Sequence, residues 1–265
     1  MKSSQDNQFI ASLTTSSANR VELTKEEARL NGSRPQMEVL RLAFFRFMSD
    51  PMSGLGAVII LCVITVALLA PVLAPNDPVQ VNYQARFESP GAEYLFGTDH
   101  LGRDMFSRVV HGTRLSLMVA IIVSLISAGI GIVLGGLAGY QGGLIDEGIM
   151  RVTDVFISFP WLLFAMSIAL VLGPNLWNSM LALSFVWWPG YARLVRSQVL
   201  RVKSYDFVEA AHSLGASHFR VLFHHVLPNT LGPYIVLITI GAGRVILATS
   251  TLSFIGFGAQ PPTPE

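Results

Sequence analysis

Charged side chains are scarce in this sequence. Asp, Glu, Lys and Arg supply only 13% of its 265 residues, while 51% are hydrophobic. A soluble globular domain carries about 25% charged residues, so the shortage argues against a water-soluble protein and indicates an integral membrane protein. The net charge of +1 gives no reason to expect nucleic acid or another polyanion as a partner.

Cysteine is nearly absent as well, and no metal or catalytic pattern takes its place. Cys62 is alone, so it can form no internal disulfide, and its apolar surroundings predict a small buried hydrophobic side chain. His212, His218, His224 and His225 lack the spacing of about three or four residues that metal ligands on a helix need. No spacing of Ser, His and Asp suggests a nucleophile with its base, so we predict neither a metal site nor an enzyme.

The N-terminal residues 1–36 are polar and contain no apolar signal-peptide core. We interpret them as a disordered cytoplasmic tail, and we expect the first apolar segment to be a retained signal anchor. Residues 37–53 place Arg41 and Arg46 among Leu and Phe side chains, which is typical of an amphipathic helix at the membrane surface. The same residues could equally be the lead into the first span.

Long apolar segments dominate residues 54–265, which we predict to form a transmembrane domain. Crossing a bilayer takes about 20 apolar residues. On that basis the fold class is all-α, a polytopic transmembrane helical bundle. The predicted spans are residues 54–74, 115–140, 148–172, 176–191 and 230–255, with an outer loop at 75–114 and a hairpin at 196–229.

Two of the spans carry residues that predict local geometry. Gly131, Gly135 and Gly139 recur at four-residue spacing in the second span, which favours close approach of another helix backbone. Pro160 lies inside the third span, where it removes a backbone hydrogen bond and should kink the helix.

The basic residues predict the orientation in the membrane. Of the 18 Lys and Arg residues, thirteen lie on the side of the N-terminal tail and the hairpin, and four lie on the opposite side. Because the more basic side is normally cytoplasmic, the tail and the hairpin should face the cytoplasm. Five spans would leave the sequence GFGAQPPTPE on the outer side, so we expect a sixth span to follow it.

The hairpin is the most informative stretch. An amphipathic helix over Glu209, Ala210 and Ala211 is followed by a break at Gly215, a second helix, and Leu227-Pro228 where the last span begins. The two alanines allow another protein to approach closely, and Glu209 offers it a fixed charge. Because so ordered a hairpin has no evident purpose in water alone, we expect a partner to dock there.

The spacing of these six residues resembles the EAA loop of ABC-transporter permeases. In that family the loop is the coupling helix and lies in a groove of a cytoplasmic ATPase. Further motifs look like the "C" subunits of dipeptide, oligopeptide, glutathione and nickel importers, and the resemblance runs from about residue 40 to the end. These motifs are Phe96-Gly97-Thr98-Asp99, Leu101-Gly102-Arg103-Asp104, Ser107-Arg108, Gly112 to Ser116, Asp146, Met150-Arg151, Asp154, Ser158, Pro160 and Leu252 to Gly256.

The resemblance implies half of a translocation path in the bacterial cytoplasmic (inner) membrane. Its partners would be a second homologous permease subunit, one or two ABC ATPase subunits and an extracytoplasmic solute-binding protein. The chain has no G-x-x-x-x-G-K-[ST] phosphate loop, so ATP and magnesium would be bound by the separate ATPases and no cofactor by this chain.

Several charged residues are candidates for the path or its gates. Arg151 and Asp154 lie three apart at the cytoplasmic end of the third span, where we favour a structural pair over a gate. Arg244 lies beside Gly241 and Gly243, which we expect to interrupt the fifth span. An arginine there should line the path or face a carboxylate of the partner subunit.

The outer loop offers a second candidate surface. Asp99, Arg103 and Asp104 could contact the binding protein, or they could hold the loop together, because the two carboxylates closely flank the arginine. We favour the structural interpretation.

Two rival functions remain. A secondary transporter driven by an ion gradient would need carboxylates near the middle of the bilayer, and the only candidate, Asp154, lies near an edge. A membrane assembly subunit without transport is the other rival. The residues do not name the solute, so dipeptides, oligopeptides, glutathione and nickel chelates stay open.

Overall fold

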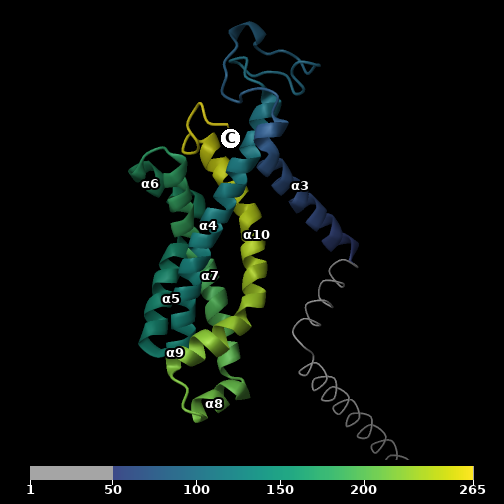
Figure 1. The fold of residues 1–265 in the computed structure, drawn as a ribbon. Coiled ribbons are helices and arrows are strands. Elements are labelled where there is room, and N and C mark those ends of the chain that lie inside the picture. Colours follow the sequence, from purple (N-terminus) through teal and green to yellow (C-terminus); the bar gives the residue numbers. More distant parts are fainter. Residues whose placement is uncertain (1–49, 265) are drawn as a thin grey trace, which may run out of the picture. The chain divides into compact units, whose positions relative to one another are not determined.

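The computed structural model describes residues 50–264, and every regular element in this range is helical (Figure 1). The all-α prediction is therefore confirmed for these residues. The predictions for residues 1–36, and for nearly all of 37–53, fall outside them. The elements are α3 (Pro51–Leu73), η1 (Tyr83–Ala85), α4 (Met105–Gln141), α5 (Gly143–Ser158), α6 (Trp161–Leu172), α7 (Leu176–Lys203), α8 (Asp206–Ser213), α9 (His218–Arg220), η2 (Val221–Val226) and α10 (Leu227–Phe254).

The chain divides into two units between Cys62 and Val63, and each is described by itself. The boundary falls within α3, an apolar helix whose side chains are mostly exposed. Cys62 is exposed too, so the predicted burial of this side chain is wrong. An apolar side chain on a membrane helix can face lipid, and the apolar run around Cys62 therefore did not require a protein core.

Helices α4 and α7 share the most extensive contact in the second unit, and α10 packs alongside both (Figure 1). A Cβ atom added to Gly131 would lie 2.3 Å from Cβ of Tyr191, and one added to Gly135 would lie 2.3 Å from the carbonyl oxygen of Ala192. One turn further on, a Cβ at Gly139 would lie 2.8 Å from the carbonyl oxygen of Arg196. The predicted packing role of the three glycines is confirmed, with α7 as the neighbouring helix.

Two apolar clusters fill the second unit, one beside α6 and one beside the hairpin. The cluster beside α6 joins α4, α6, α7 and α10, and its members include Val123, Ala165, Met180, Leu183, Val245 and Leu252. The cluster beside the hairpin joins α4, α7, α8, η2 and α10, and its members include Tyr140, Val195, Val199, Val208, Val221 and Val226. The hairpin is therefore part of the folded core along one of its faces.

The third predicted span is broken into two helices. Helices α5 and α6 meet at 92°, so residues 148–172 do not form the single kinked helix that we predicted but two helices with a sharp bend between them. Proline disfavours the helical conformation of the residue before it, and Phe159 is extended, with φ −83° and ψ 140°. Helix α5 also begins earlier than predicted, at Gly143, so that the preceding turn is confined to Gly142.

The second span begins earlier than the predicted Leu115, because Asp104 caps α4. Its carboxylate accepts hydrogen bonds from the backbone N–H groups of Phe106 and Ser107, at 3.1 and 3.3 Å. An aspartate at this position satisfies N–H groups that have no partner within the helix. The outer loop is therefore shorter than the predicted 75–114 and ends at Asp104.

Helix α10 continues through Gly241 and Gly243, so the expected interruption of the fifth span does not occur. A glycine in a helix lowers its stability without breaking it, and packing against α4 and α7 holds this one together. The fourth predicted span, 176–191, is the first part of α7, which runs on to Lys203. The hairpin proper is thus confined to residues 204–226.

By length and hydropathy, three helical segments within residues 50–264 could cross a membrane: α3, α4 and the continuous His218–Phe254 segment. The bent α5–α6 pair raises the number to four if it counts as one span. Helix α7 is long enough, but polar and proline residues such as Asn178 and Pro189 lower its hydropathy.

Candidate functional site

The hairpin begins with α8, which has a well-defined start and end. Asp206 and Glu209 lie in its first turn, where the helix dipole favours negative charge. At its end Gly215 takes φ +82°, its N–H donates to His212, and the N–H of Ala216 donates to Ala211 at 3.1 Å. This pair of hydrogen bonds is the Schellman motif, in which the left-handed residue is normally glycine. The predicted glycine break is confirmed.

The six residues of the EAA-like spacing have different positions within the hairpin. Glu209 and Ala210 are exposed, Ala211 is half-buried against the apolar cluster, and Gly215 forms the break. Leu227 and Pro228 form the first turn of α10, and Leu227 packs on the same cluster. The motif therefore includes an exposed helical face and the points where the hairpin joins the bundle.

The inner face of the hairpin is apolar and buried. Val208 of α8, Val221, Leu222 and Val226 of η2 pack with Tyr140, on α4, and with residues of α7 and α10. Burying each such side chain, relative to leaving it exposed, stabilises the fold by about 1.5–3 kcal/mol. This face fixes the hairpin to the bundle.

The outer face is also apolar but open. Leu214 is 88% exposed, and Phe207 nearby in the chain is also exposed. Phe219 and Phe223 are exposed as well, but they line a cavity between the hairpin and α4. Phe219 and Phe223 stack with ring centroids 4.3 Å apart. Exposed apolar groups gathered around one short segment mark a surface for another molecule.

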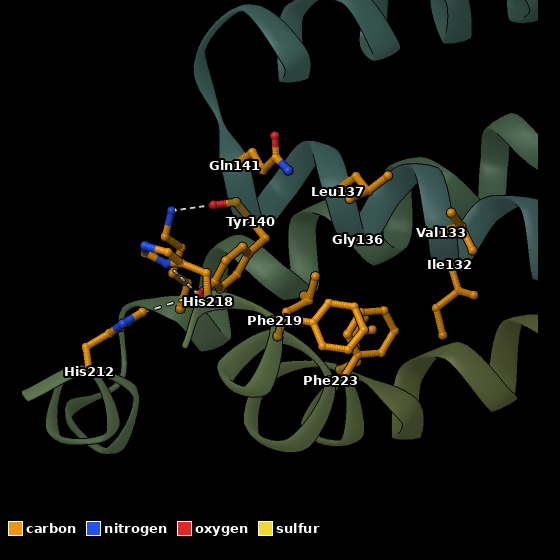
Figure 2. Close-up of a pocket in the computed structure, with 13 residues that line it drawn as sticks. Ile132, Val133, Gly136, Leu137, Tyr140, Gln141, His212, His218, Phe219 and Phe223 are labelled. Carbon is orange, nitrogen blue, oxygen red and sulfur yellow. Dashed lines mark hydrogen bonds between the residues drawn. The ribbon is translucent and has the colours of Figure 1, made fainter. Parts of the chain in front are cut away.

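A polar cluster connects the hairpin to the end of α4, as Figure 2 shows. The hydroxyl of Tyr140 lies 3.3 Å from Nε2 of His212 and 3.3 Å from Nδ1 of His218. The Lys203 ammonium, at the end of α7, donates to the backbone carbonyl of Tyr140 at 2.7 Å and lies 5.4 Å from the centre of its ring. Our sequence reasoning considered two of these histidines only as metal ligands and missed Tyr140.

A cavity of about 820 Å³ adjoins this cluster. Its walls are mainly apolar and come from α4, α9, η2 and the start of α10, including Val133, Leu137, Phe219, Leu222 and Phe223. Figure 2 shows the polar groups gathered at one end and Ile132 and Val133 at the other. Apolar contact between the hairpin and α4 is thus incomplete here.

Ion pairs join α5 to α7 beside the hairpin. Arg196 donates two hydrogen bonds to Asp146, at 2.5 and 2.6 Å, and Arg193 donates to Asp154 at 2.6 Å. Arg151 pairs instead with Glu147, at 3.4 Å. The expected pairing of Arg151 with Asp154 is therefore wrong, because an arginine of the neighbouring helix reaches the aspartate.

Arg244 lies on α10 at a second cavity, of about 660 Å³, which it lines with Pro160, Trp187 and Tyr191. Its side chain is exposed, and within residues 50–264 no carboxylate pairs with it. The role of this residue in the path or at a partner subunit stays a prediction.

The three charged residues of the outer loop interact with the loop itself. Asp99 accepts hydrogen bonds from the N–H groups of Leu101 and Arg103, at 2.8 and 3.0 Å, and from the Arg103 guanidinium at 2.7 Å. Burial alone would raise the pKa of Asp99, but these hydrogen bonds outweigh it and lower the pKa. Arg103 and Asp104 are buried, and contact of any of the three with a binding protein stays a prediction.

No group of three or more His, Cys, Asp or Glu side chains within the described part of the chain could hold a metal ion. His212 and His218 converge on a tyrosine hydroxyl rather than on a third metal-ligand side chain.

Two family models match the chain. Residues 131–265 match the binding-protein-dependent transport system inner membrane component, and residues 39–90 match the N-terminal transmembrane domain of oligopeptide transport permease C. The first match includes α5, α6, α7, the hairpin and α10, together with the part of α4 that carries its packing glycines.

Curated relatives agree with both matches. The chain is 41% identical over 225 residues to the dipeptide transport system permease protein DppC of Alkalihalophilus pseudofirmus, covering 85% of this chain and 74% of the relative. It is 39% identical to the probable D,D-dipeptide transport system permease protein DdpC of Escherichia coli, covering 91% and 78%. A glutathione transport system permease protein, GsiD of Pectobacterium atrosepticum, is 37% identical, covering 83% and 73%. The chain therefore belongs to the family of inner membrane components of binding-protein-dependent transport systems, and it is a multi-pass permease subunit.

Proposed function

We propose that this permease subunit imports peptides or related small solutes and forms half of the translocation path, with a second homologous permease subunit forming the other half. The names of its relatives support this solute class, since they describe permease proteins of dipeptide, probable D,D-dipeptide and glutathione transport systems. An extracytoplasmic binding protein would select and deliver the solute.

The observation that carries the proposal is the hairpin with its two unlike faces. The inner face is buried against α4, α7 and α10, whereas the outer face exposes Glu209, Ala210 and Leu214. We infer that the outer face docks into a groove of a cytoplasmic ABC ATPase, of which the complex holds one or two. ATP and magnesium would be bound by those ATPases.

The proposed coupling is mechanical. ATP binding closes the ATPase pair, the groove moves α8, and the transmembrane helices tilt to open the path alternately to the two sides of the membrane. The hairpin faces the cytoplasm in this scheme, as does the N-terminus. The excess of Lys and Arg around the hairpin supports this orientation, with Arg201 and Lys203 in the last turn of α7.

Charge reversal at Glu209 tests the proposal. We expect Glu209→Lys to abolish co-purification of the ATPase subunits and ATP-driven uptake of a labelled dipeptide into vesicles, at normal permease levels. Glu147→Lys is the matched control, because Glu147 is also an exposed glutamate, and its pair with Arg151 is too exposed to contribute much stability. Uptake and ATPase binding should persist in the control.

Gly215→Pro tests the lever itself. Proline requires φ near about −65°, whereas Gly215 has φ +82°, so the turn after α8 must change. Survival of normal uptake and normal ATPase stimulation in both Glu209→Lys and Gly215→Pro would refute the proposed coupling. Uptake that persists in ATP-depleted vesicles under an imposed proton gradient would favour the ion-driven alternative.

A further inference from the structure

We propose that Tyr140, His212 and His218 form a hydrogen-bonded joint that holds the hairpin to the end of α4, so that α8 and α4 move as one body during coupling. The inference rests on the proposed function of the hairpin, and it assigns a positioning role to three residues outside the EAA-like spacing. The joint connects three elements, since Tyr140 lies on α4, His212 on α8 and His218 on α9.

The two hydrogen bonds depend on each other. A tyrosine hydroxyl has one proton, so it can donate to one imidazole nitrogen and must accept from the other. The joint is therefore complete only when one histidine presents a bare ring nitrogen and the other an N–H group. The rings of His212 and His218 are 5.1 Å apart. Tyr140 is only 7% exposed and His212 is half-buried, whereas His218 is exposed, so water competes mainly for the ring of His218.

The joint is the polar link between the hairpin and α4. Within residues 50–264, the side-chain hydrogen bonds that connect α8 and α9 to α4 both end on the Tyr140 hydroxyl. Next to it, the 820 Å³ cavity separates parts of the two surfaces, so apolar packing does not hold them together there. A force applied to α8 also reaches the bundle through the chain connection to α7 and through the buried apolar face that includes Val208, so the joint adds a direct polar link to α4.

The end of α4 is in turn fixed to α7. Lys203 donates to the carbonyl of Tyr140, one of the last carbonyls of the helix, which have no partner within it. The preceding residue, Gly139, is in close contact with the backbone of Arg196 and the side chain of Val199. Moving Tyr140 therefore moves α4 and α7 together.

A spin-label distance tests whether the joint holds. In the complete complex, Cys62→Ala removes the native thiol, and labels are attached at Ser213→Cys on α8 and Leu125→Cys on α4, both exposed positions. We expect one narrow distance distribution that is the same with and without ATP. Tyr140→Phe, which removes only the hydroxyl, should broaden the distribution and lower dipeptide uptake per ATP hydrolysed about ten-fold, with the two hydrogen bonds lost.

A metal bridge provides the rescue. Tyr140→His shortens the side chain by roughly 2 Å, about one zinc–nitrogen bond. The ring nitrogens of His212 and His218 lie 3.3 Å from the hydroxyl, so each imidazole must move inward by about 1 Å for Zn²⁺ at the former hydroxyl position to bind all three rings. We expect Zn²⁺ to restore the narrow distribution and the coupling ratio in Tyr140→His. Tyr140→Phe and the unmodified chain, which lack the third imidazole, should not respond to it.

The outcomes separate the joint from the proposed function. A spin-label distance that changes with ATP in the unmodified chain would overturn the joint. So would a Tyr140→Phe variant with the same distance distribution and the same uptake per ATP as the unmodified chain. Zn²⁺ that blocks uptake by Tyr140→His while leaving the unmodified chain active would also overturn it, because the joint would then have to open. The spin-label distance is measured without solute, so it tests the joint even if the complex takes up no dipeptide. A lack of dipeptide uptake would count against the proposed substrate alone.

Discussion

Gly135 gives the sharpest test of how the bundle is held together. It faces α7, where an added Cβ would lie 2.3 Å from the carbonyl oxygen of Ala192 and 2.9 Å from its Cα. Gly129 lies on the same helix with no atom within 4 Å of an added Cβ. Gly135→Ala and Gly129→Ala are therefore the same chemical change at a closed and at an open position.

The difference between the two variants isolates the packing cost. Alanine improves the intrinsic helix propensity at both positions by about 0.8–1 kcal/mol, a gain that cancels in the comparison. At Gly135 the obstructing atoms belong to a backbone, so they cannot rotate away, and the helices must separate. Overpacking of this kind costs about 1–3 kcal/mol, and it also weakens the contacts at Gly131 and Gly139 on the same face. We expect Gly135→Ala to be less stable than Gly129→Ala by about 3 kcal/mol.

Reversible denaturation of the purified chain in detergent, followed by tryptophan fluorescence, measures this difference. Trp188 is buried on α7 and should report separation of the helices. Equal stability of the two variants would mean that α4 and α7 are not in backbone contact in the membrane protein, and the argument for a rigid α4–α7 pair would fail.

Three further predictions concern the ion pairs, the outer loop and the hairpin. Asp146→Asn should lower stability by about 1–2 kcal/mol, because it breaks a bidentate ion pair in which the side chains of Asp146 and Arg196 are only 17% and 33% exposed. Glu147→Gln, which breaks an exposed pair, should have almost no effect. Denaturation of both variants in detergent measures the difference. Because the pKa of Asp99 is lowered in the fold, its contribution to loop stability is present above its unfolded pKa of about 3.9 and is lost as pH falls through the lower folded value. Proteolysis of residues 74–104 should thus increase in acid, and less so in Asp99→Asn. Leu214→Ser, at an exposed site, should leave stability within about 0.5 kcal/mol of the unmodified chain yet weaken ATPase co-purification, while Val208→Ser, at a buried site, should lower stability.

The features that the sequence predicted well are set by residues close together in the chain. Gly215 ends α8 through hydrogen bonds that stay within six residues, from Ala211 to Ala216, so the break could be seen in the sequence. The packing glycines of α4 were visible for the same reason, since a spacing of four residues places them on one face. The spacing of the glycines could not, however, identify α7 as the helix that packs against them.

The features that were missed depend on contacts between distant residues or on geometry that a residue type does not fix. Asp154 pairs with Arg193, which is 39 residues away, although the nearer Arg151 made a plausible partner on the same helix. Pro160 indicated a kink, but the 92° angle depends on how α6 packs against α7. Tyr140 lies 72 and 78 residues from its two histidines, and nothing local distinguishes it from a core aromatic residue.

Gly139 and Tyr140 are neighbours in the chain, and this connects the packing of α4 to the hairpin. One residue is in contact with α7, and the next holds His212 and His218. If force passes from α8 through Tyr140 to the α4–α7 pair, the two residues are successive links in one connection. Once one of these links is lost, losing the other should reduce coupling little further. The double variant of Gly139→Ala and Tyr140→Phe should therefore lower uptake per ATP by less than the two single effects combined. Fully additive effects would instead mean that α8 acts on α7 and α4 by separate routes.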